Sequence, residues 1–195
     1  SLRQLVAELD GRDRIAIAVY AGASGLVLPP TPGSDRAAIL GALDRLQAGG
    51  GTNGGQGLLL AYQTARKDFI PGGTNRVILA TDGDFNLGVT DRTDLLDMIA
   101  RESGGGIFLT ALGYGMGNYK DDFLETLADK GNGNYAYIDS PREARKVLVD
   151  GMGGTLITVA KDVKIQVEFN PLRVESYRLI GYENRVLAKE DFNDD

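Results

Sequence analysis

The chain has 195 residues, with 27 acidic and 21 basic side chains and a formal net charge of −6. This negative balance argues against a nucleic-acid partner, because DNA and RNA attract basic surfaces. The sequence contains no cysteine and no histidine, which excludes disulfides, thiolate chemistry and imidazole as a base or ligand. Any bound metal must therefore be held by oxygen atoms, as magnesium, calcium and manganese prefer.

The first part of the chain alternates helical and strand patterns. Residues 2–10 have the apolar spacing of an amphipathic helix without a start signal before it, so we interpret Ser1 as a cut end inside a larger protein. A buried strand is predicted at 14–20, and a short strand at 25–28 that ends at two prolines. A helix capped by Ser34 or Asp35 follows, and then a glycine loop at 49–55 that leads into a helix ending near Phe69.

The same alternation continues to about residue 160. Apolar strands are predicted at 77–80, 107–112 and 135–138, with helices that begin at Asp91 or Thr93, near Asp121, and at Pro141. Continuous apolar strands alternating with helices indicate a doubly wound, mainly parallel α/β sheet covered by helices on both faces. No apolar run approaches the roughly 20 residues that span a bilayer, so we expect no direct membrane insertion by this segment.

The pattern changes at Lys161. Apolar residues at 163, 165, 167 and 169 alternate with polar ones, and 177–180 give a further strand, which is typical of antiparallel strands with one exposed face. We therefore predict a main domain over residues 1–160 and the start of a β-rich appendage over 161–195. Two or three strands are too few for an independent sheet, so we interpret the carboxyl end as a second cut end.

Two loops carry candidate chemistry. Ligands of open parallel sheets bind beyond the carboxyl ends of the strands. Asp82 directly follows a predicted buried strand, and Thr52 lies in the glycine loop that begins a helix. A carboxylate and a hydroxyl that converge there suit a hard divalent cation. Taken singly, each has a structural explanation, since Asp82 can shape its turn and Thr52 can cap its helix.

Taken together, these motifs resemble the von Willebrand factor type A domain over about residues 2–160. The likeness rests on the Gly-Gly-Gly-Thr-Asn run at 49–53 before an amphipathic helix, on Ile-Leu-Ala-Thr-Asp-Gly at 78–83, and on the strand end at 20–22. It implies a metal-ion-dependent adhesion site, with Thr52 as the second-loop hydroxyl and Asp82 as the third-loop carboxylate. It further implies a protein partner whose acidic side chain fills the open metal position, while Asn53 or Asp84 steadies the surrounding waters.

The first metal loop of that family is missing. The family's Asp-x-Ser-x-Ser sequence would lie before residue 2, and Ser24 does not replace it, so affinity for Mg²⁺ (or Mn²⁺ or Ca²⁺) is expected to be poor. The missing first strand is central in the family's order, which leaves strands 14–20 and 77–81 without their shared neighbour. Because unpaired buried backbone is costly, we expect a strand to fill the gap, from the appendage, from a second copy in a strand-swapped dimer, or from a cleaved piece.

The appendage carries a likeness of its own. Residues 161–171 and 177–185 resemble the segment that follows this domain in a family of bacterial envelope proteins, which favours the bacterial cell envelope as the location. A β extension that merely packs on the main domain explains the same residues equally well.

Two rival binding sites fit the sequence less well. Asp82, Asp84 and Asn86 match the first positions of an EF-hand calcium loop, but Leu87 and Thr93 stand where Gly and Glu are required. The glycine loop lacks the lysine of a nucleotide-binding loop, and residues 113–117 do not match the dinucleotide spacing.

We expect no enzymatic activity. A metal-assisted hydrolase that uses Asp82 or Asp84 as a base is the less favoured rival, and the acids at 91, 94 and 97 are better explained as a helix start that the helix dipole favours. The main alternative to metal-dependent binding is a structural or interaction domain with a vestigial metal site, which binds through another surface.

Overall fold

The computed structural model describes residues 1–20, 25–47, 53–81, 91–115, 122–151 and 165–178. The chain divides into two compact units, Ser1–Thr158 and Val159–Asp195. Within the described residues, no helix is both long and apolar enough to cross a membrane.

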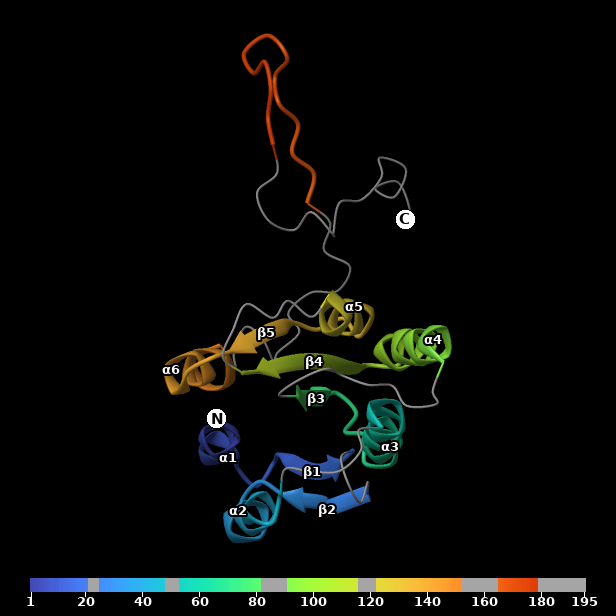
Figure 1. Ribbon diagram of the computed structural model, residues 1–195, viewed down its shortest axis with the longest axis vertical. Helices are drawn as coiled ribbons and strands as arrows, with labels where there is room; N and C mark the ends of the chain where they lie inside the picture. The colour runs from blue at the N-terminus through green and yellow to red at the C-terminus, as the bar shows by residue number, and fades with distance from the viewer. Residues whose placement is uncertain (21–24, 48–52, 82–90, 116–121, 152–164, 179–195) are drawn as a thin grey trace. The chain divides into compact units, whose positions relative to one another are not determined.

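Helices and strands alternate along the first unit (Figure 1). The strands are β1 (Arg14–Val19), β2 (Gly25–Pro32), β3 (Asn75–Thr81), β4 (Ile107–Tyr114) and β5 (Tyr135–Ile138). The helices are α1 (Leu2–Glu8), α2 (Arg36–Asp44), α3 (Gly54–Lys67), α4 (Arg92–Gly104), α5 (Asp122–Lys130) and α6 (Pro141–Arg145), which runs into a short π-helix, η1 (Lys146–Asp150). Every element predicted for this part of the chain is present, with ends that differ by a few residues.

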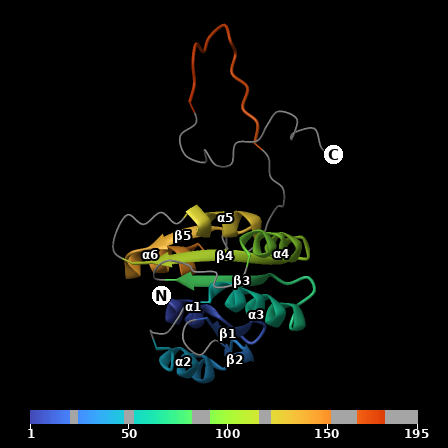
Figure 2. The same ribbon diagram turned by 45° about the vertical axis from the view of Figure 1, so that its right-hand side comes forward.

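The strands form two sheets. β3, β4 and β5 pair in parallel, in that order, whereas β1 and β2 form an antiparallel pair. The apolar side chains of β3 and β4 divide between two cores on opposite faces: Leu79 and Leu109 pack with helices α3, α4 and α5, and Leu112 packs with α1, α6 and η1. Helices therefore cover both faces (Figure 2), and the predicted doubly wound α/β class is confirmed.

The predicted end of the second strand at its prolines is wrong. β2 continues through Pro29 and Pro30 to Pro32, and Pro32 lies opposite Arg14 of β1. Proline has no backbone N–H, but an edge strand needs donors on one side only. Among the described strands β2 pairs with β1 alone, so the missing donors interrupt no second ladder.

No described strand lies between β1 and β3, which belong to separate sheets. Helices α1 and α3 join the sheets instead. Val6 of α1 packs with Ile15 and Ile17 of β1, while its neighbour Leu5 belongs to a core that includes Ile78 of β3. The predicted separation of the two strands is thus present, and no described segment of this chain fills it.

The second unit is described over residues 165–178, where the expected strands are absent. The chain turns at Asn170, whose carbonyl accepts from the backbone of Arg173 and Val174 at 3.0 Å each. Phe169 and Tyr177 stack with ring centroids 4.5 Å apart, but no ladder forms between the two arms. Alternating apolar residues need a paired neighbour to form a strand, and the described residues of this unit supply none.

Candidate metal site

Both predicted metal ligands, Thr52 and Asp82, lie outside the described residues, as do Asp84 and Ser24. Their immediate neighbours Asn53 and Thr81 are described: Asn53 precedes helix α3, and Thr81 is the last residue of β3. Asn53 and Thr81 therefore mark the points at which the two loops join the described elements, and we call these points, with Ala80 beside Thr81, the anchors of the loops.

Tyr20 holds these two anchors together. Its backbone carbonyl, directly after β1, accepts a hydrogen bond from the Asn53 N–H at 3.0 Å. Its side-chain hydroxyl donates to the carbonyl of Ala80 in β3 at 2.8 Å. One residue thus connects the end of β1, the start of α3 and the end of β3, and the loops that contain Thr52 and Asp82 leave from the same edge of the fold.

The start of α3 is built for close approach to Tyr20. Asn53 caps the helix by accepting from the Gln56 N–H at 3.3 Å, and its own backbone is not helical. One turn later, a Cβ on Gly57 would overlap the Cβ of Tyr20. Glycine at this position lets the helix lie directly against the end of β1, which brings Asn53 to the carboxyl end of that strand.

Asn53 is therefore a helix cap in this structure. Asp91 is also a cap: its carboxylate accepts from Thr93 N at 2.8 Å and Asp94 N at 3.2 Å at the start of α4. This confirms the interpretation of Asp91 and Asp94 as part of a helix start, whereas Asp97 lies beyond the first turn. Within the described ranges, no group of three or more acidic side chains is placed to hold a metal.

The donor chemistry of the edge fits a hard cation. The described residues at this edge include Tyr20, Asn53 and Thr81, whose side chains offer oxygen and amide groups and no sulfur or imidazole. The chain as a whole has no cysteine or histidine. A magnesium or manganese ion at this edge would thus meet the ligand types that it prefers.

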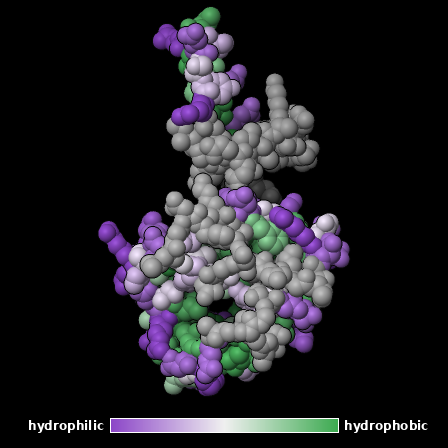
Figure 3. All heavy atoms as spheres, in the orientation of Figure 1, coloured by the Kyte–Doolittle hydropathy of each residue, from purple (hydrophilic) through white to green (hydrophobic). Residues whose placement is uncertain are grey.

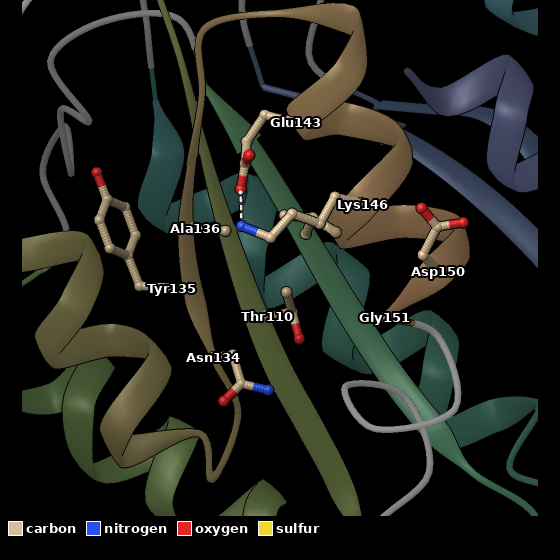
Figure 4. Close-up of a pocket in the computed structure, with 9 residues that line it drawn as sticks. Thr110, Asn134, Tyr135, Ala136, Glu143, Lys146, Asp150 and Gly151 are labelled. Carbon is tan, nitrogen blue, oxygen red and sulfur yellow. Dashed lines mark hydrogen bonds and ion pairs between the residues drawn. The ribbon is translucent and has the colours of Figure 1, made fainter.

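A cavity of about 390 Å³ lies elsewhere, between β4, β5 and the α6–η1 segment (Figure 4). Its described lining includes Thr110, Asn134 and Asp150, and none of the residues around Tyr20. Glu143 and Lys146, three positions apart on the α6–η1 segment that forms one wall, make an ion pair at 3.1 Å, so their charges compensate one another. This cavity is not part of the candidate metal site.

The sequence did not single out Tyr20 as the residue that organises the edge. The sequence places it at the end of a strand, but the hydrogen bond to Ala80 joins residues 60 apart in the chain. The short glycine-rich start of α3 was the available signal, because a glycine in a helix interior marks close packing against another element.

The comparisons with known proteins agree with this architecture. The chain belongs to the von Willebrand factor type A domain family, which matches residues 1–149. Residues 154–195 match a second family, described as Uncharacterized protein YfbK, C-terminal.

Individual relatives give the extent of the likeness. A protein of Escherichia coli K12, "Uncharacterized protein YfbK", is 53% identical over 195 residues, which are 100% of this chain and 34% of that protein. The chain thus spans about a third of the length of this curated relative. The structure of a von Willebrand factor type A protein from Catenulispora acidiphila is 26% identical with a TM-score of 0.61, over 78% of this chain and 37% of that one. Proximal thread matrix protein 1 from the mussel byssus, with a zinc-occupied MIDAS motif, shares the fold at 17% identity and a TM-score of 0.54, over 80% of this chain and 40% of that one.

Proposed function

We propose that the chain is a divalent-metal-dependent protein-binding module and not an enzyme, with Thr52 and Asp82 as metal ligands. The observation that supports this most directly is the pair of hydrogen bonds that Tyr20 makes, accepting from the Asn53 N–H and donating to the Ala80 carbonyl. Since each ligand is within two residues of one of these anchors, the hydroxyl of Thr52 and the carboxylate of Asp82 can reach a common ion. Membership of the von Willebrand factor type A family adds the precedent of such a site in other members.

When bound, the metal supplies an open coordination position for an acidic side chain of the partner. In this proposal Thr52 and Asp82 hold the ion. Tyr20 fixes the distance between the loops that carry them. Asn53 or Asp84 steadies the surrounding waters in this proposal. A charged contact of this kind gains strength where the partner surface excludes water. We also propose a bacterial cell envelope location, on the likeness of residues 161–185.

The metal that we propose is Mg²⁺ or Mn²⁺. The mussel byssus protein carries zinc in its adhesion motif, so zinc is the competitor to include. Zinc favours nitrogen and sulfur ligands, which this chain cannot offer because it contains neither histidine nor cysteine. Oxygen donors select the harder ions.

The test is calorimetric titration of Mg²⁺, Mn²⁺ and Zn²⁺ into the chain and into a form extended at its amino terminus. Thr52→Ala and Asp82→Ala should each abolish the heat of Mg²⁺ binding in the extended form, and the chain alone should bind weakly. Asp97→Ala, which removes an exposed acid from α4, is the matched control and should leave binding unchanged. Equal loss in all three variants would indicate a general charge effect and contradict the assignment. Absence of binding in both forms would favour a vestigial site and a binding surface elsewhere.

A further inference from the structure

Arg76 of β3 carries a charge that no described acidic side chain balances. Its Nη1 donates to the Thr110 hydroxyl at 2.7 Å, and its guanidinium carbon lies 5.6 Å from the centroid of the Phe108 ring. Its Nε is buried, and among the described residues it has no hydrogen-bond partner and no carboxylate pairs with the side chain. Burial lowers the pKa of this guanidinium. A cation withdrawn from water without a counter-charge is costly, so an anion held nearby would stabilise it.

Thr110 connects Arg76 to the cavity of about 390 Å³ between β4, β5 and the α6–η1 segment. Because the Thr110 oxygen accepts from Arg76, its own hydroxyl proton can donate to a group in the cavity. In Figure 4 this hydroxyl points toward the side of the cavity where Asn134 lies. The side-chain amide of Asn134 is a second donor there. This end of the cavity therefore suits an acceptor with negative charge.

The other charges of the described lining are paired. Lys146 contacts Glu143 at 3.1 Å, and Asp150 lies 3.7 Å from Arg145. All four residues belong to the α6–η1 segment, and Figure 3 shows mainly hydrophilic side chains over α6, at the left of the view. Since each of these pairs is neutral, Arg76 supplies the unbalanced charge of this part of the described structure.

The backbone of η1 also favours a ligand site. η1 is a π-helix, in which the Gly151 N–H bonds to the Lys146 carbonyl five residues back, at 2.7 Å. Such helices are rare and occur frequently at functional sites. Val147 of η1 and Ala136 of β5 line the cavity with apolar side chains. The volume lies within the range of about 300–1,000 Å³ of small-molecule sites.

We propose that this cavity binds a small aliphatic monocarboxylate, with the carboxylate at Thr110 and Asn134 and the alkyl end against Ala136 and Val147. The carboxylate accepts from the Thr110 hydroxyl, whose oxygen stays bonded to Arg76. The guanidinium thus balances the charge of the ligand across one hydrogen bond. This site is separate from the proposed metal edge and does not depend on it.

The number of charges favours a carboxylate over a phosphate. One negative charge matches the one unbalanced cation, Arg76. A phosphate dianion would bring a second negative charge close to the carboxylates of Glu143 and Asp150, which line the same cavity. Like charges at short range repel, so the dianion should bind less well.

The experiment is thermal unfolding of the 195-residue chain in sodium butyrate, compared with sodium chloride and sodium phosphate at the same ionic strength. A ligand that binds only the folded state raises the folding constant by the factor 1 + [L]/Kd. For a ligand of about six heavy atoms we expect a Kd on the order of 1 mM. Butyrate at about 20 mM should therefore raise the folding constant about 20-fold relative to chloride.

Arg76→Met tests the charge, because methionine keeps much of the length of the side chain. It should abolish the butyrate effect and leave the ligand-free chain about as stable as the parent, since an unpaired charge is removed. Arg101→Met, which removes an exposed arginine from α4, is the matched control and should leave the butyrate effect unchanged. If Arg76 served the fold alone, Arg76→Met would lower stability and the butyrate effect would remain.

Val147→Phe tests the cavity without changing a charge, and it decides the question if Arg76→Met does not fold. Val147 is only partly buried, so the larger ring can occupy the space of the alkyl end. This variant should fold and lose the butyrate effect. Equal stability in butyrate and chloride would overturn the proposal, as would a butyrate effect that survives either variant. An Arg76-dependent effect of phosphate larger than that of butyrate would overturn the assignment to a monocarboxylate.

Discussion

Replacement of Gly57 by alanine tests the contact on which the candidate site depends. In an ordinary helix interior this change stabilises the fold by about 1 kcal/mol, because alanine loses less backbone entropy than glycine. In α3 the new methyl would overlap the Tyr20 Cβ and lie 3.1 Å from its Cγ. The Cβ is fixed to the backbone and cannot rotate away, so overpacking should cost about 3 kcal/mol, the upper part of its usual range. The expected net result is a loss of about 2 kcal/mol.

The matched control is Gly41→Ala in α2. There the nearest atom to the new methyl is the flexible Arg45 side chain at 3.8 Å, so this variant should gain about 0.5–1 kcal/mol. Urea unfolding followed by circular dichroism measures both variants and should give opposite signs relative to the parent chain. A Gly57→Ala variant as stable as Gly41→Ala would refute the close packing of α3 on Tyr20, and with it the convergence of the two loops.

Two further substitutions test the core. Burial raises the pKa of Tyr62 above its ordinary value of 10.0; the unfolded chain therefore ionises first as the pH rises, and stability is complete below pH 10.0 and lost above it. Tyr62→Phe should flatten that alkaline loss in thermal melts between neutral and alkaline pH; an unchanged slope would show that Tyr62 does not cause it. Asn75 is buried, accepts from the Ile70 N–H and donates to the carbonyls of Ile70 and Gly73. Asn75→Ala should cost about 2–3 kcal/mol in denaturant unfolding because it leaves buried polar groups unsatisfied, whereas the exposed Asn134→Ala should change stability by less than about 0.5 kcal/mol.

The order and type of the elements could be predicted because each depends on local patterns. The apolar run of β4 indicates a buried strand wherever it lies in the chain, and Asp91 and Ser140 cap their helices through residues two or three positions away. The end of β2 was mispredicted because the effect of a proline depends on whether its strand lies at an edge. The strands expected in residues 165–178 did not form, because alternation indicates a strand only when a partner is present.

The candidate site could be predicted in part. The motifs around Thr52 and Asp82 suggest a common edge, and their described neighbours lie at one. The contact that holds these neighbours together, through Tyr20, could not be predicted. A tyrosine at a strand end has many potential acceptors; in the fold, Gly57 packs on Tyr20 and the Tyr20 hydroxyl donates to the carbonyl of Ala80. Such contacts join distant parts of the chain, and neither residue type nor spacing encodes them.

The prolines of β2 have a consequence for self-association. An exposed strand edge is a template on which further chains can add and from which aggregates grow. Pro29, Pro30 and Pro32 supply no backbone N–H along this strand, so an incoming strand would find few donors there. Ordered aggregates therefore find it harder to grow from this edge, because the prolines cannot donate hydrogen bonds to an added strand.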